Sequence, residues 1–269
     1  MIKPAVGNTP VMKQFLKIKA KYKNTIILFR MGDFYETFLD DAVITSKVLG
    51  IVLTKRANGK AADVNLAGFP YHSLDNYLPK LVNAGYRVAI CEQIENPKTS
   101  KGIVKRDVVE VVTPGTLTAD KTLNDKSNRY ICSMYFDKNN IGIAFLDSST
   151  GEFHIGQCNE ENIQYNLLKF CPQEVVLSNK ITYSNSSWYL EYKPFVTQVD
   201  EWLFDFEIAY RVLINHFKVQ SLKSFGCEKM SHGISAAGAL VKHLNDNLST
   251  SIYNISKLSP IVDKGFMVL

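Results

Sequence analysis

The stretch Phe29-Arg30-Met31-Gly32-Asp33-Phe34-Tyr35-Glu36 decides how the front half of this chain folds. Residues 25–30 are mostly apolar and β-branched, which is typical of a buried strand. Met31-Gly32-Asp33 then predicts a turn, because glycine and aspartate readily adopt turn conformations. We expect a second helix to follow the turn and to end at Gly50, so that Phe34 stands where a strand gives way to a helix.

Patterns on either side of that stretch predict a mixed α/β domain. Thr9 and Pro10 are typical of a helix start, and apolar residues at helical spacing over 11–22 give that helix one buried face. A third candidate helix covers 73–83, with Pro79 kinking it or delaying its start. Further strands are expected at 51–54, 86–92 and 108–112, and a turn at 57–60.

The back half of the chain predicts a second α/β domain. Three successive strands joined by short turns indicate an antiparallel meander, expected at 129–136, 141–147 and 152–157. The later elements alternate, which favours a sheet with helices on its faces. They are helices at 162–170, 207–216 and 234–244 and a strand at 174–178. A polar segment over 116–128 is expected to link the two domains.

Composition limits the class of protein. Hydrophobic residues make up 46% of the chain and charged residues 21%, which is enough for two ordinary cores. The sequence has no signal-peptide pattern and no apolar run of the roughly 20 residues that cross a bilayer, so we expect a cytoplasmic protein without membrane contact. Its five widely spaced cysteines indicate reduced, mostly buried thiols. The apolar ending at 266–269 leads us to expect a piece of a longer protein, although a docked terminal strand would end alike.

Positive charge is concentrated in the front half. Residues 1–115 hold 17 Lys and Arg against 10 Asp and Glu, whereas the remainder holds 14 against 16. A basic front half indicates contact with a polyanion, although such a charge also serves solubility.

Two interpretations of Phe34 and Glu36 follow from the residues alone. Phenylalanine is usually buried, and an acid in the first turn of a helix is stabilised by the helix dipole, so both residues can be purely structural. Alternatively, an aromatic side chain at a strand end projects from a rigid base with an acid two residues away.

Blocks in a fixed order decide between these interpretations. They are Thr9-Pro10-Val11-Met12, the opening stretch 29–36, Leu53-Thr54-Lys55-Arg56, Ala67-Gly68-Phe69-Pro70-Tyr71-His72, Ala89-Ile90-Cys91-Glu92-Gln93-Ile94 and Val112-Thr113-Pro114-Gly115-Thr116. The series closely resembles the amino-terminal part of the MutS family of bacterial DNA mismatch repair proteins. The resemblance implies an α/β chain with a mismatch-recognition domain over 1–115, the linker over 116–128, a ribonuclease-H-like connector domain over 129–245 and the start of a core, or lever, domain over 246–269.

The family's Phe-x-Glu motif falls on Phe34 and Glu36. The resemblance implies that Phe34 stacks on the mispaired base from the minor groove and that Glu36 hydrogen-bonds to that base. It also implies groove or backbone contacts from a wider set, namely Met31, Lys55, Arg56, Leu66, Gly68, Phe69, Lys98, Lys101, Lys105 and Arg106. The turn expected at 66–69 lies beside the wedge. Four positions depart from the family's usual residues, namely Leu66, Phe69, Asp107 and Glu110. These departures affect where the edge of the expected DNA contact surface lies, but not its centre.

The resemblance also fixes the expected partners. Double-stranded DNA with a mismatch or small loop would bind the first domain, and the partner MutL the connector domain. We expect no catalytic residue, metal or cofactor in this chain, whereas the full-length family member is a homodimer that uses ATP and Mg²⁺. Two alternatives stay open: a scaffold with only protein partners, and a ribonuclease-H-like metal-dependent nuclease with Asp147, Glu152 and Asp205 as candidate ligands.

Overall fold

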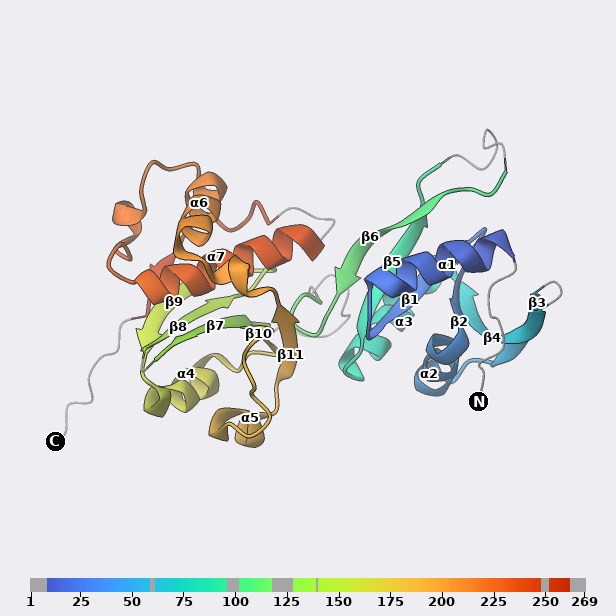
Figure 1. Ribbon diagram of the computed structural model, residues 1–269, viewed down its shortest axis with the longest axis horizontal. Helices are drawn as coiled ribbons and strands as arrows, with labels where there is room; N and C mark the ends of the chain where they lie inside the picture. The colour runs from blue at the N-terminus through green and yellow to red at the C-terminus, as the bar shows by residue number, and fades with distance from the viewer. Residues whose placement is uncertain are drawn as a thin grey trace. The chain divides into compact units, whose positions relative to one another are not determined.

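The computed structural model describes residues 9–58, 61–95, 102–117, 128–138, 140–247 and 252–261. The chain divides into two compact units, Met1–Leu123 and Asn124–Leu269 (Figure 1). Each unit contains one six-stranded sheet with helices packed on it. The expected α/β class with two domains is therefore confirmed.

The sheet of the first unit is mixed, with one parallel pair of strands and otherwise antiparallel pairs. The strands stand in the order β3-β4-β2-β1-β5-β6, in which only β1 and β5 run parallel. The elements are α1 (Pro10–Lys21), β1 (Thr25–Met31), β2 (Phe34–Phe38), α2 (Leu39–Leu49), β3 (Thr54–Asn58), β4 (Ala61–Pro70), α3 (Leu74–Asn83), β5 (Arg87–Gln93) and β6 (Arg106–Val112).

Helices cover both faces of this sheet. Because side chains alternate along a strand, Ile27 and Phe29 of β1 face one way and Ile26 and Leu28 the other. The first pair packs with α1, whose Phe15 meets Phe29 edge to face at 5.8 Å between ring centroids. The second pair packs with α3 and the apolar side of α2. The first unit thus has two cores separated by the sheet.

The prediction that a helix starts directly after the Met31-Gly32-Asp33 turn is wrong. The strand β2 comes first, and α2 begins only at Leu39. The strand forms because its backbone pairs with β1 on one side and with β4 on the other. Two further expectations also shift: the strand placed at 51–54 runs over Thr54–Asn58, and 66–69 lies within β4 and is not a turn.

The second unit has the expected meander. Strands β7 (Ile131–Asp137), β8 (Asn140–Leu146) and β9 (Phe153–Cys158) pair antiparallel, and β10 (Glu174–Ser178) and β11 (Phe195–Val199) continue the sheet in parallel. The order β11-β10-β7-β8-β9-β12 fits the expected ribonuclease-H-like sheet, with β12 (Ser259–Pro260) added at the edge. The helices are α4 (Ile163–Phe170), α5 (Ser187–Tyr192), α6 (Phe206–Phe217) and α7 (Ser231–Asn247). The sequence pattern did not reveal α5 or β11.

Small residues let α7 lie against its neighbours. A Cβ placed on Gly238 would stand 2.4 Å from the Cα of Ala209 in α6, and one on Gly142 would stand 1.8 Å from the carbonyl oxygen of His232. Both contacts are too close for any side chain, so glycine is required where the backbones meet. The small-residue pattern noted at 234–244 is therefore a packing surface, and most of α7 is buried.

The domain boundaries differ from the expectation at two places. Thr116 and Leu117, placed in the linker, are buried in the first unit, whereas 118–127 lies outside the described residues. The segment 246–269 was expected to start a further domain. Its described part belongs to the second unit, because Ile252, Ile255 and Leu258 are buried in that unit's core and β12 pairs with β9.

Two expectations about composition can be compared with the structure. All five cysteines are free thiols, and Cys91, Cys132 and Cys227 are buried, which confirms mostly buried thiols. Within the described ranges, no helix combines the length and the apolar character needed to cross a membrane.

Candidate nucleic-acid interface

A tight hairpin presents Phe34. Met31 pairs with Phe34 across a two-residue turn, Gly32-Asp33, in which Gly32 adopts a φ of 59° that side chains disfavour. The Phe34 side chain emerges at this corner and is 47% exposed. The backbone is held firmly, since the Tyr71 amide donates to the Asp33 carbonyl oxygen at 2.9 Å.

The opposite face of the hairpin rests on aromatic and charged side chains. Tyr35 is buried, and its hydroxyl donates a hydrogen bond to the Glu92 carboxylate. Its pKa lies well above the usual tyrosine range because of burial and this carboxylate. The Arg30 guanidinium lies 3.8 Å from the centroid of the Tyr71 ring. Phe34 therefore stands on a strand whose other face is packed, and it has a rigid base.

Glu36 lies on the same face of β2 as Phe34, two residues along the strand. Its carboxylate accepts a hydrogen bond from Nη1 of Arg56 on β3 at 2.6 Å. The Glu36 side chain is 19% exposed and that of Arg56 is 38% exposed. Burial raises the pKa of Glu36 above its usual range, and the positive charges of Arg56 and Arg106 oppose the rise. The acid beside the wedge is thus partly desolvated and already has a cationic partner.

Gly68 makes room for Glu36. It pairs with Glu36 across β2 and β4, and a Cβ at this position would stand 2.9 Å from the Tyr35 carbonyl oxygen and 3.5 Å from Cγ of Glu36. Any side chain here would press on the β2 backbone. Gly68 therefore acts by its lack of a side chain, and it is half-buried.

Six of the remaining predicted contact residues fall into three groups. Met31 and Leu66 are half-buried and lie on the wedge face, where both pack against the core under α1. Lys55 and Lys105 are exposed, as phosphate contacts require. Lys98 and Lys101 lie outside the described residues.

Two expected contact residues are buried. Phe69 is 2% exposed, and its ring packs on Tyr35 and Tyr77, because alternation along β4 turns it to the face opposite Gly68. It therefore lines no groove in this structure. Arg106 is 8% exposed. Its Nε donates to the Arg30 carbonyl oxygen at 2.5 Å, so its guanidinium supports the sheet edge beside the hairpin.

Sequence reasoning missed the contact between Glu36 and Arg56. The two residues are 20 positions apart on strands that do not pair directly, since β4 lies between them. No local pattern could have signalled this contact while β4 itself was unrecognised.

Comparison with known proteins accounts for both units. The family model described as MutS domain I matches residues 9–121, and the one described as MutS domain II matches residues 129–257. This chain belongs to the MutS family. It is 45% identical over 261 residues to the protein named DNA mismatch repair protein MutS from Cytophaga hutchinsonii, and 45% identical over 270 residues to that from Flavobacterium psychrophilum. The matches cover 96% and 97% of this chain but about 30% of the length of each relative.

The nuclease alternative placed metal ligands in MutS domain II. Asp147 instead accepts two backbone hydrogen bonds, one within its own turn from the Ser149 amide at 2.8 Å and one from the Arg129 amide, which precedes β7, at 3.0 Å. Glu152 accepts from the Tyr130 hydroxyl, and Asp205 caps α6 by accepting from the Ile208 amide. In the part of the chain that the structure describes, no three His, Cys, Asp or Glu side chains stand close enough to hold a metal.

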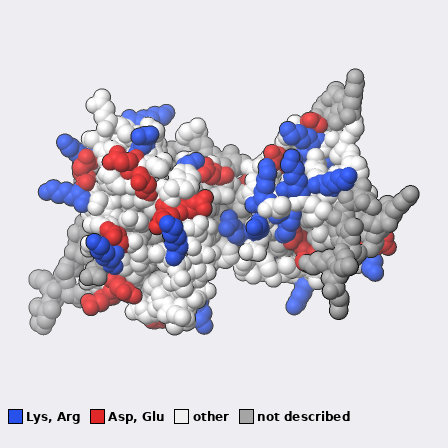
Figure 2. Space-filling model, in the orientation of Figure 1, with Lys and Arg blue, Asp and Glu red and all other residues white. Residues whose placement is uncertain are grey.

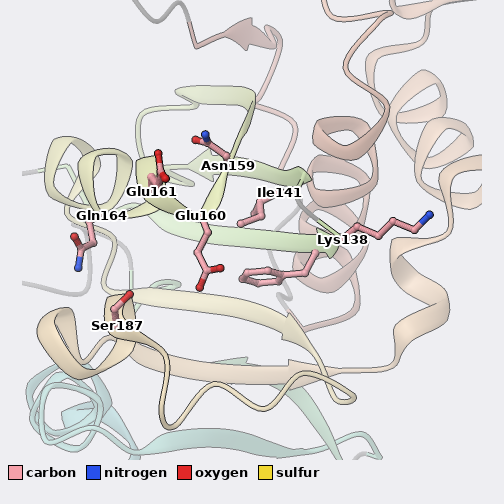
Figure 3. A pocket seen from close by; sticks show the side chains of 8 residues that line it. Lys138, Ile141, Asn159, Glu160, Glu161, Gln164 and Ser187 are labelled. Carbon is pink, nitrogen blue, oxygen red and sulfur yellow. The ribbon is translucent and has the colours of Figure 1, made fainter.

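A pocket of about 580 Å³ opens in MutS domain II beside the β7–β8 turn. Its lining consists of Phe136, Lys138, Ile141, Asn159, Glu160, Glu161, Gln164 and Ser187 (Figure 3). Figure 3 shows Lys138 extending away from the other labelled side chains. Among its described lining residues, Glu160 and Glu161 carry the carboxylates, and neither belongs to the proposed set of Asp147, Glu152 and Asp205.

Proposed function

We propose that this chain binds mismatched DNA in mismatch repair, with Phe34 stacking on the mispaired base from the minor groove and Glu36 hydrogen-bonding to it. The observation that carries the proposal is the half-exposed Phe34 ring on a packed hairpin, with a carboxylate on the same face. Exposed phenylalanine on a rigid turn is unusual, since this side chain is among those most often buried.

The physics of the duplex supplies the selectivity. An apolar wedge between base steps unstacks them and kinks the duplex by about 20–90°. Unstacking costs a few kcal/mol, and it costs least where the pair is already faulty. A ring that tests deformability accepts many different errors, because it reads no base sequence.

Glu36 adds a hydrogen bond whose direction depends on its proton. The ionised carboxylate accepts from a thymine imino N–H, but a purine N7 is itself an acceptor and requires the protonated acid. Burial already favours protonation, whereas Arg56 favours the ionised form. We therefore propose that Glu36 takes up a proton at mismatches that present N7. Loss of binding to those mismatches in a Glu36→Gln variant, which keeps an N–H donor, would count against this.

Phosphate contacts position the duplex around the wedge. Among the residues expected to make them, Lys55 and Lys105 are exposed, and the Arg56 side chain is 38% exposed while its Nη1 donates to Glu36. Lys98 and Lys101 remain in the proposal on the strength of the family resemblance.

The rest of the proposal concerns the longer family member. There, MutS domain II would couple the DNA reader to an ATPase and contribute to binding MutL, and two copies would enclose the duplex. ATP and Mg²⁺ belong to that longer protein: this sequence contains no Gly-x-x-x-x-Gly-Lys-Ser/Thr phosphate loop. No step proposed for this chain passes through them.

A titration tests the proposal. Labelled G·T heteroduplex and matched homoduplex are titrated with the chain at two salt concentrations, alongside Phe34→Ala and Tyr253→Ala. Tyr253 is 85% exposed in the second unit and serves as the matched aromatic control. We expect salt-sensitive binding of both duplexes, a preference for the heteroduplex, and loss of that preference in Phe34→Ala alone. Equal affinity of the unaltered chain for both duplexes, or metal-dependent cleavage of either, overturns the proposal.

A further inference from the structure

Helix α1 carries a row of lysines on its outer side. Its inner side is buried through Met12, Phe15 and Ile18. Lys13, Lys17 and Lys21 follow one another at four-residue spacing, so they align along one face, and all three are exposed. We call them the lysine ridge. The helix sequence from Pro10 to Lys21 contains no acidic residue, and Figure 2 shows Lys and Arg gathered over α1.

The ridge is not explained by the stability of the fold. Lys19, which is not part of it, pairs with the buried Asp41 at 2.6 Å and donates to the Thr25 carbonyl oxygen, so it ties α1 to the sheet. No carboxylate of the described residues forms an ion pair with the ridge lysines. Lys13 lies near the amino-terminal end of α1, where the helix dipole disfavours a cation.

The ridge starts near the wedge and runs away from it. Helix α1 packs on the sheet face that carries Glu36 and Arg56, because Phe15 contacts Phe29 and Phe38 on that face. At its amino-terminal end, Gln14 accepts a hydrogen bond from Arg106 at 3.3 Å. Arg106 in turn binds the carbonyl oxygen of Arg30, one residue before the hairpin's Met31. Lys13 is therefore the ridge member nearest the hairpin, and Lys21 lies at the far end.

We propose that the lysine ridge binds the sugar-phosphate backbone of the duplex arm that leads away from the kinked site. The proposal rests on the function proposed above. Lys21 lies eight helical positions after Lys13, which is a rise of about 12 Å. Duplex DNA carries one charge per about 1.7 Å of axis, so a ridge of this length lies opposite several phosphates. Such contacts add affinity for any sequence and none for the mismatch itself.

The test compares two double variants of equal charge. Lys13→Gln with Lys17→Gln removes two ridge charges and leaves Lys21, whose place in the last turn favours the helix dipole. Lys47→Gln with Lys80→Gln removes two exposed charges from α2 and α3, which pack on the other face of the sheet. Affinities for homoduplex and G·T heteroduplex are measured across a salt series. Thermal unfolding of each variant checks that it is folded.

We expect the ridge variant to bind both duplexes more weakly by the same factor. The slope of log affinity against log salt should fall by up to about 1.8, which is about 0.9 for each lost phosphate contact. The ratio of heteroduplex to homoduplex affinity should not change. The proposal that the ridge binds DNA is overturned if the slope of log affinity against log salt does not change. It is also overturned if the change is no larger than in the Lys47 and Lys80 variant. Failure of the proposed mismatch-binding function is a separate result: the unaltered chain would then show no preference for the heteroduplex.

Discussion

The ion pair between Glu36 and Arg56 should make the stability of this chain depend on pH in a defined way. The perturbation is a double-mutant cycle with Arg56→Met and Glu36→Gln. Methionine retains an apolar stem, which matters because the Arg56 side chain also lies 5.9 Å from the Phe38 ring centroid. The cycle therefore isolates the charge interaction from the packing.

The expected magnitude follows from the exposure of the two side chains. Pairs in solvent contribute roughly 0.2–1 kcal/mol, and breaking a fully buried pair costs roughly 3–5 kcal/mol. Here the contact is short, at 2.6 Å, but Arg56 is 38% exposed and Glu36 is 19% exposed. We therefore expect a coupling free energy of about 1 kcal/mol at neutral pH, at the upper end of the solvent-exposed range.

The sign of the pH dependence follows from the direction of the Glu36 shift. Burial raises the folded-state pKa of Glu36 above its unfolded value. The folded chain therefore holds this proton more tightly, and the associated stability is lost as pH rises through the folded pKa. Arg56 limits that loss by stabilising the carboxylate. Replacing Arg56 should accordingly cost more at pH 7.5, where Glu36 is ionised, than at pH 4, where it is increasingly protonated.

Urea unfolding of the four proteins at the two pH values measures the cycle. We expect a coupling that is positive at pH 7.5 and clearly smaller at pH 4. A coupling that is equal at both values, or larger at the acidic one, refutes it.

Three further predictions concern other parts of the chain. Gly68→Ala should lower the free energy of unfolding by about 1–2 kcal/mol in urea titrations, because its Cβ would press on the Tyr35 carbonyl oxygen; a neutral effect would contradict this. A thiol reagent at pH 8 should label exposed Cys171 in the folded chain but spare Cys91, whose pKa burial raises to about 12; equal labelling would be the contrary result in mass spectra. Asp147→Ala should destabilise the chain by about 1–3 kcal/mol in thermal unfolding, because backbone donors lose their acceptor; an unchanged or higher melting temperature would contradict this.

Helices and strands with a regular apolar pattern could be predicted from the sequence. The apolar spacing over 11–22 gave α1, and the three strands joined by short turns gave the meander of the second unit. In both cases the signal is local, because the residues that define the period are neighbours in the chain.

The strand β4 could not be predicted. It contains Asp63, Asn65, Gly68 and Pro70, which are all poor strand formers. It forms because β2 and β3 pair with it on either side, and such pairing overrides local propensity. Missing β4 had consequences at the site. Without the strand's alternation, Phe69 could not be assigned to the buried face.

The exposure of Phe34 could not be predicted from the residue types in the sequence either. The residue types favour a buried phenylalanine, and the family resemblance alone pointed to an exposed one. The structure explains how the exposure is possible. Alternation places Tyr35 in the core and turns Phe34 to the other face at the first position of β2, where it is 47% exposed.

The most direct test of the central claim measures whether the Phe34 ring opens the base stack. A G·T heteroduplex carries a fluorescent adenine analogue next to the mismatch, whose emission rises when it is unstacked. Saturating amounts of the chain should raise the emission, Phe34→Tyr should retain most of the increase because it keeps the ring, and Phe34→Ala should abolish it. An equal rise with bound Phe34→Ala, or no rise with the bound unaltered chain, would contradict the account.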